Sequence, residues 1–179
     1  LEIAMPMFHV GFKAKPEKGI EAVRAEIETN FVLSLLADES SDFYKKLYDD
    51  GIINTSFSSE VFMGDGYFCS IFAGESRNPR LVRDKIIEEI NRCKKDGLDE
   101  KRFNIIKKSY YGALIRDLND AEAIATIMLN AGMEKLSAFD VIESVAAVTF
   151  EDVQKRLEKQ FNTENVTLSI IEPLADKEE

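Results

Sequence analysis

The sequence has one histidine and two cysteines in 179 residues, so it has few of the side chains that hold transition metals. A catalytic zinc usually takes three protein ligands, and the H-x-x-E-H, H-E-x-x-H and C-x-x-C patterns are all missing. The G-x-S-x-G pattern of a serine nucleophile is missing as well. This chain by itself is therefore predicted to have no cofactor and no hydrolytic activity.

Long apolar runs and an excess of basic residues are missing too. No run approaches the roughly 20 apolar residues needed to cross a bilayer, and no basic segment followed by an apolar one marks a secretory signal. The net charge is −10, whereas nucleic acids and anionic membranes attract a basic face. We therefore predict a cytoplasmic protein that binds neither nucleic acid nor membrane, although the same charge permits a basic peptide partner. Cys69 and Cys93 are interpreted as buried thiols, and the start at Leu1 indicates a processed chain or a part of a longer one.

Hydrophobic periodicity divides the chain into strands, which repeat every two residues, and helices, which repeat every three or four. Gly64-Asp65-Gly66, between two β-rich runs, is typical of a hairpin because glycine supplies the positive φ of a tight turn. Ser137 and Thr149 each begin a capping-box pattern. The predicted order is a strand at 7–14, helices at 16–36 and 41–50, strands at 54–63 and 67–73, helices starting at 78, 99, 121, 137 and 149, and a strand at 165–171.

This order predicts an α+β protein with an antiparallel or mixed sheet of about four strands and helices packed on one face. We expect one such domain over residues 1–173 and a charged tail at 174–179. Within the strand predicted at 54–63, Ser56, Ser58 and Glu60 fall on the same face, and the second face of the sheet is expected to carry them together with His9. The second face of the sheet is therefore expected to be more polar than a fully covered one.

A single glycine, Gly51, joins a short amphipathic helix to the sheet. Tyr44 and Tyr48 lie on the apolar stripe of that helix, and Asn54 follows the glycine. These three residues, together with His9 on the first strand, are candidate substrate-binding residues because such a corner can present them to a ligand. The alternative is structural, since aromatic residues of a short helix are more often core and a lone strand histidine more often has a structural role.

The order of the elements and several local sequences resemble the insulinase or pitrilysin-like zinc peptidases, the inverzincins, and most closely the C-terminal half of bacterial members. The similar segments, spread over nearly the whole chain, are Met5-Pro6, 11–13 (GFK), Ser40-Ser41, 47–51 (LYDDG), Asn78-Pro79, 99–103 (DEKRF) and 148–153 (VTFEDV). In that family two related halves close like a clamshell around a peptide, and the zinc motif H-x-x-E-H belongs to the N-terminal half. The resemblance implies a metallopeptidase-half-like sandwich without its own metal, a peptide substrate, and zinc in a partner N-terminal half.

Some family members use an arginine and a tyrosine of the second half to hold the substrate near the scissile bond. The local match puts the arginine position at Tyr48 and the tyrosine position near Asn54. Neither residue type is therefore kept at its position, and Tyr48 and Asn54 are candidates to replace these substrate contacts. The function implied by the resemblance is to enclose and orient a peptide beside the metal of the other half. The alternative is a non-catalytic interaction or assembly subunit of the same fold. A self-sufficient enzyme is disfavoured because no catalytic group of residues emerges.

Overall fold

The computed structural model describes residues 3–174, and the predicted order of elements is confirmed. The helices and strands of that range are β1 (Met7–Ala14), α1 (Ile20–Ala37), α2 (Asp42–Asp49), β2 (Ser58–Gly64), β3 (Tyr67–Glu75), α3 (Pro79–Asp96), α4 (Glu100–Asp117), α5 (Ala121–Met133), α6 (Ala138–Ala147), α7 (Phe150–Gln160) and β4 (Val166–Ile171). The charged tail predicted at 174–179 lies, apart from Leu174, outside the described residues. Within residues 3–174, no helix is long and apolar enough to cross a membrane.

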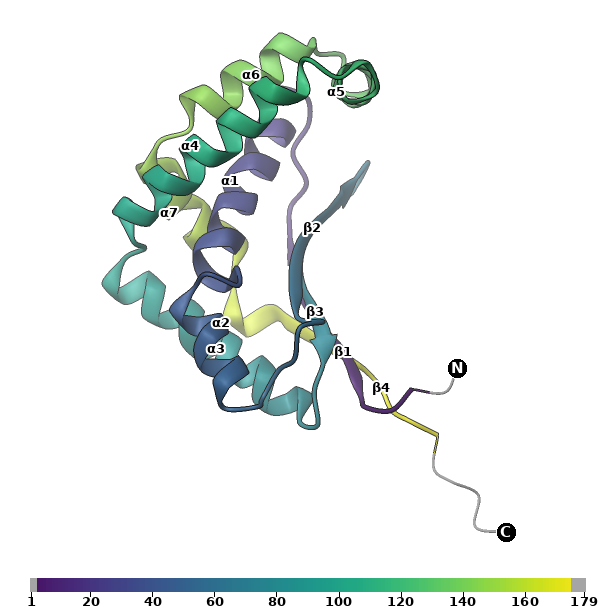
Figure 1. The fold of residues 1–179 in the computed structure, drawn as a ribbon, viewed down its shortest axis with the longest axis vertical. Helices are drawn as coiled ribbons and strands as arrows, with labels where there is room; N and C mark the ends of the chain where they lie inside the picture. The colour runs from purple at the N-terminus through teal and green to yellow at the C-terminus, as the bar shows by residue number, and fades with distance from the viewer. Residues whose placement is uncertain (1–2, 175–179) are drawn as a thin grey trace.

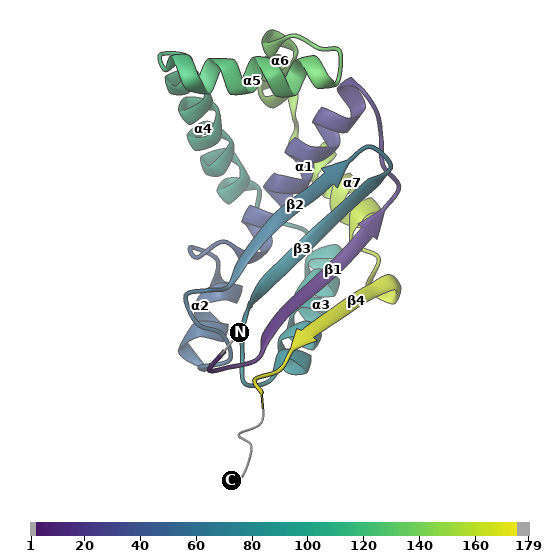
Figure 2. The same ribbon diagram turned by 90° about the vertical axis from the view of Figure 1, so that its right-hand side faces the viewer.

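The four strands form one antiparallel sheet in the order β2-β3-β1-β4. The strand nearest the N-terminus therefore lies inside the sheet, between the hairpin strand β3 and the last strand β4 (Figure 2). This pairing confirms the predicted α+β class. It also places the two ends of the described chain at the same end of the molecule (Figure 1).

Helices α1, α3 and α7 cover one face of the sheet (Figure 1). Alternate residues of β1 point into this layer, and Phe12 contacts Phe72 of β3 and Phe161 after α7 at ring-centroid distances of 6.1 and 5.4 Å. Each buried aromatic side chain contributes roughly 1.5–3 kcal/mol to folding. The apolar core thus lies between the sheet and these three helices.

An outer layer of α4, α5 and α6 packs beyond α1 and makes much less core. Helix α4 fully buries only Phe103, and α5 only Ala131. Large hydrophobic side chains are exposed along this layer, namely Ile105, Tyr110, Tyr111, Ile115, Met128, Leu129, Met133 and Phe139. One backbone hydrogen bond ties the layer to the start of α1, from the Gly19 N–H to the Glu134 carboxylate at 3.0 Å.

Two predicted element starts are wrong, for local reasons. The helix predicted from Pro16 begins four residues later, because Gly19 takes a positive φ of 59° that ends the preceding extended segment. The strand predicted from Asn54 begins at Ser58, because the backbone turns between Asn54 and Phe57 through an N–H to C=O hydrogen bond of 3.1 Å.

A buried ion-pair network fixes the segment before α1 to the helical layer. The Arg156 guanidinium on α7 donates to Glu28 of α1 at 2.8 Å and to Glu17 at 3.3 Å, and Lys159 also pairs with Glu17. Burial raises the pKa of Glu28 although Arg156 opposes the shift. Burial acts in the same direction on Glu17, but Lys159 and Arg156 outweigh it and lower the pKa of that carboxyl.

Candidate functional site

The face of the sheet opposite α1, α3 and α7 is covered by no helix of residues 3–174 and is turned toward the viewer in Figure 2. All of its side chains are exposed or half-exposed. They are Met7, His9, Gly11 and Lys13 of β1, Ser58, Glu60, Phe62 and Gly64 of β2, Tyr67, Cys69, Ile71, Ala73 and Glu75 of β3, and Thr167, Ser169 and Ile171 of β4. We call this set the open face.

In the middle of the open face three small residues surround the larger, half-exposed Ile71. Gly11 on the inner strand β1 pairs with Ile71 of β3 and Thr167 of β4, and a Cβ built on it would have no heavy atom within 4 Å. Ala73 and Cys69 lie on β3, the other inner strand. We call Gly11, Ala73, Cys69 and the Ile71 between them the floor of the open face. Cys69 is half-exposed there, so its prediction as a buried thiol is wrong.

Two aromatic side chains stand at the hairpin end of this floor. The rings of Phe62 and Tyr67 are 5.1 Å apart between centroids, inclined by 33°, and 53% and 37% of their surfaces are exposed. The Tyr67 ring lies directly over Gly64, because a Cβ on Gly64 would come within 2.6 Å of it. The glycine therefore lets the ring lie flat against the backbone.

His9 is the predicted site residue that lies on the open face. Its neighbours across the sheet are Ala73 and Ser169, and the imidazole is exposed. Glu60 is also exposed on this face, on strand β2. The expectation of a more polar second face is thus met by these residues, but Phe62 and Tyr67 add an apolar region to it. The placement of Ser56 on this face is wrong, because Ser56 lies in the turn before β2.

The other three predicted site residues lie at the α2–β2 corner. Tyr44 is buried against Phe57 at 6.0 Å and stacks on the exposed Tyr48 at 6.1 Å, with planes within 9°. The Asn54 amide donates to the Glu75 carboxylate at 3.0 Å, and its oxygen accepts from the Ser56 N–H at 2.9 Å. Asn54 therefore fastens the corner to the end of β3. The structure does not bring His9 together with the tyrosines, and a substrate-binding role for these residues stays a prediction.

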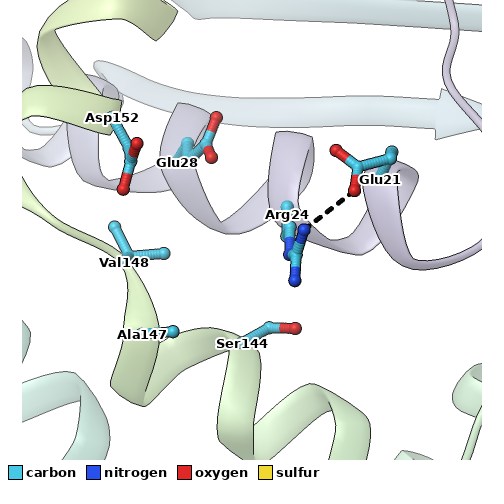
Figure 3. Close-up of a pocket in the computed structure, with 7 residues that line it drawn as sticks. All are labelled: Glu21, Arg24, Glu28, Ser144, Ala147, Val148 and Asp152. Carbon is cyan, nitrogen blue, oxygen red and sulfur yellow. Dashed lines mark hydrogen bonds and ion pairs between the residues drawn. The ribbon is translucent and has the colours of Figure 1, made fainter.

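A second candidate is a pocket of about 260 Å³ between α1, α6 and the start of α7 (Figure 3). Its charged groups are already engaged. Arg24 pairs with Glu21 at 2.8 Å, Glu28 binds Arg156, and Asp152 accepts from the Thr149 backbone in a capping box. The remaining lining residues are Ser144, Ala147 and Val148. This pocket is part of the helical packing, and the open face is the better site candidate.

No group of three or more His, Cys, Asp or Glu residues that could hold a metal ion occurs in the part of the chain that the structure describes. His9 has no second imidazole to join it, because the sequence contains one histidine. The polar groups of the open face offer exposed hydrogen-bond donors and acceptors. They are not arranged as a metal cage.

Sequence reasoning missed Gly11, Phe62 and Tyr67 as site residues. A signal for each was present. The alternation of β2 puts Phe62 on the same face as Ser58 and Glu60, where a large aromatic residue is unexpected. Gly11 interrupts an otherwise regular strand pattern, which often marks a close approach of another chain.

Comparisons with known proteins show what the chain is similar to. No family model matches the chain. The chain is 26% identical over 175 residues to YmfH, an uncharacterized zinc protease of Bacillus subtilis, with 97% of this chain and 41% of YmfH covered. A structure assigned as an M16-like peptidase from Alicyclobacillus acidocaldarius matches with a TM-score of 0.89 at 20% identity, over 97% of this chain and 42% of that one.

A structure named as the inactive peptidase domain of a protein assigned as a zinc protease, from Bordetella parapertussis, matches with a TM-score of 0.82 at 12% identity. It covers 100% of this chain and 97% of that one. The predicted resemblance to the insulinase or pitrilysin-like zinc peptidases is confirmed: the chain is similar to a zinc protease, to an M16-like peptidase and to an inactive peptidase domain, and it fits a C-terminal half of such a protein. It spans about two fifths of the length of YmfH.

Proposed function

We propose that this chain is the metal-free C-terminal domain of an insulinase-like zinc peptidase, which encloses and orients a peptide beside a zinc-bearing N-terminal half. The observation that carries the proposal is the open face, a four-stranded surface covered by helices on its other side only. Confining and orienting the substrate can lower a reaction barrier substantially, even when the confining surface carries no catalytic group. A domain of this kind contributes to hydrolysis by holding the peptide in place beside the zinc of the other half.

The chemistry of the open face supports this role. His9, Ser169 and Thr167 offer exposed donors and acceptors, and the inner strands β1 and β3 each pair with a neighbouring strand on both sides. Peptide amides can exchange hydrogen bonds with such side chains at little cost. Peptide as substrate and zinc in the partner half come from the family relationship, and the polar face is compatible with both.

Reconstitution with an H-x-x-E-H half of the same family, co-expressed from the same genome, tests the proposal. We expect the isolated chain to hold no stoichiometric zinc and to cleave no peptide, and the assembled pair to cleave a quenched-fluorescence peptide in a chelator-sensitive way. One tightly bound zinc in the isolated chain, with hydrolysis abolished by chelator, would overturn the proposal.

The second candidate is a non-catalytic interaction or assembly subunit of the same fold. The exposed hydrophobic residues of the outer layer, such as Met133 and Phe139, favour a protein partner. A stable complex with the H-x-x-E-H half that hydrolyses nothing would support this candidate over the first. A cytoplasmic location, without nucleic acid or membrane as partner, is part of both proposals, and cell fractionation tests it.

A further inference from the structure

The helical layer ends in a segment that is held to the rest of the protein by few contacts. It comprises the end of α4, all of α5 and the first half of α6, residues 113–143, and we call it the flap. Figure 2 shows α5 at the far end of the molecule, joined to the core through α4 and α6. On either side of the flap the chain is anchored by Phe103 and Val145, which are 3% and 1% exposed, whereas the flap itself buries only Ala131 fully.

One hydrogen bond joins the flap to an element outside α4, α5 and α6. The Gly19 N–H at the start of α1 donates to the carboxylate of Glu134, which follows α5, at 3.0 Å. In the described part of the chain, no ion pair involves a flap residue, and the other hydrogen bonds of the flap stay within α4, α5, α6 and their connecting turns. The remaining attachment is apolar, through the half-buried Leu114, Leu136 and Val141. Opening the flap therefore breaks one polar contact with the body of the protein.

Glu134 suits the start of α1 for two reasons. Gly19 is the N-cap of α1 and has no side chain that could bond to the N–H groups there, and a carboxylate is favoured at the positive end of the helix dipole. The turn after α5 fixes the position of Glu134, because Lys135 takes a positive φ of 61° and the Leu136 N–H donates to the Ala131 carbonyl at 2.9 Å. The bond from Gly19 is charge-assisted and therefore stronger than one between neutral groups.

We propose that the flap opens from α1 as a unit and that the hydrogen bond between Gly19 and Glu134 keeps it closed. Gly112 is the hinge in α4, because glycine weakens a helix interior and a Cβ built on it would meet no atom within 4 Å, so no packing contact accounts for the glycine. In α6 the Ser144 hydroxyl donates to the Asp140 carbonyl at 2.7 Å, a contact that often bends helices. Opening enlarges the apolar surface at this end of the molecule.

Pulses of trypsin at increasing urea concentrations, with the cut sites identified by mass spectrometry, test the proposal on the purified chain. Arg116 and Lys135 are the trypsin sites of the flap, and Lys155 on α7, whose side chain is 69% exposed, is the reference. Cleavage follows the population of the open state when opening and closing are fast. We expect the flap sites to be cut first, with a urea dependence below about half that of global unfolding, because flap opening exposes little buried surface. The full urea dependence of global unfolding at both flap sites would overturn the proposal.

Variants of Glu134 test the hydrogen bond itself. The readout is the cleavage rate at Arg116, which is distant in sequence from the substitution. Glu134→Ala should raise this rate about tenfold, the effect of losing one partly buried hydrogen bond to a charged group. Glu134→Gln keeps an acceptor oxygen without the charge and should raise the rate about threefold. An unchanged rate in Glu134→Ala would refute the role of this contact.

Glu143→Ala is the matched control. Glu143 is exposed, belongs to the same flap and takes part in no ion pair within residues 3–174. We expect the cleavage rate at Arg116 in this variant to stay within about twofold of that of the unchanged protein. A rise equal to that of Glu134→Ala would mean that the charge of the flap, and not the contact with Gly19, sets the opening, and it would overturn the proposal.

Discussion

The ion-pair network around Arg156 gives the sharpest prediction for stability. Replacing Arg156 by Met keeps most of the packed side-chain stem but leaves the carboxylates of Glu28 and Glu17 without their buried partner. Breaking a fully buried pair costs about 3–5 kcal/mol. Here the side chains of Arg156, Glu28 and Glu17 are 9%, 15% and 20% exposed, so solvent offsets part of the loss. We expect a loss of about 2–3 kcal/mol at pH 7.

The pH dependence of this loss can be worked out from the two carboxyls. The pKa of Glu28 is raised in the folded protein, so its contribution to stability is present below its unfolded pKa and is lost as the pH rises through the folded value. Removing Arg156 raises that pKa further and enlarges the loss at pH 7. The pKa of Glu17 is lowered in the folded protein, so Glu17 stabilises the fold above its unfolded pKa. This stabilisation is lost as the pH falls, and the Arg156→Met variant has less of it to lose. Both effects make the deficit of the variant smaller at about pH 4 than at pH 7.

Urea unfolding followed by circular dichroism measures this deficit. With a slope of about 1–3 kcal/mol/M, the midpoint of Arg156→Met should fall by about 0.7–3 M at pH 7. Lys159→Met is the control, because its side chain is 58% exposed and its pair with Glu17 is worth less than about 1 kcal/mol. A deficit below about 0.5 kcal/mol for Arg156→Met, or one equal at both pH values, would refute the reasoning.

Three further predictions concern other parts of the chain. Ellman's reagent should rapidly label one thiol of the native protein, that of the half-exposed Cys69. Cys93 should react slowly, because its burial, with Glu89 nearby, raises the pKa of Cys93 to about 12. Two equally fast thiols would contradict this. Thr149→Ala removes one side of a capping box and should destabilise the protein by about 1 kcal/mol in urea unfolding, whereas no change would mean that the cap is dispensable. Met133→Gln should leave stability within about 0.5 kcal/mol and reduce the binding of a hydrophobic dye, and a large destabilisation would show that this side chain is packed.

The fold could be predicted from the sequence because its signals are local. The capping boxes at Ser137 and Thr149 mark helix starts that the structure reproduces, and Gly66, with a φ of 90°, closes the predicted hairpin. The two wrong element starts have local causes that hydrophobic periodicity does not reveal. Pro16 is a good helix start in isolation, but Gly19, with its positive φ of 59°, delays the start of the helix to Ile20.

The candidate site was only partly predictable, because it depends on which strands become neighbours. The alternation of β1 and β2 indicated that His9 and Glu60 share a face. It could not show that β3 lies between them and supplies Tyr67 and Ala73 to the same surface. Tyr44 illustrates the reverse case. An aromatic residue of a short helix can face a ligand or the core, and only the packing on Phe57 decides for the core.

The outer helical layer has a consequence for motion. Because α4 and α5 each bury a single residue fully, separating them from α1 exposes far less apolar surface than unfolding the sheet. Native-state hydrogen exchange should therefore resolve two tiers, with amides of α5 opening at a lower free energy than those of β1. Binding of a partner to α4 and α5 can therefore change their packing on α1 without changing the strand register of the sheet.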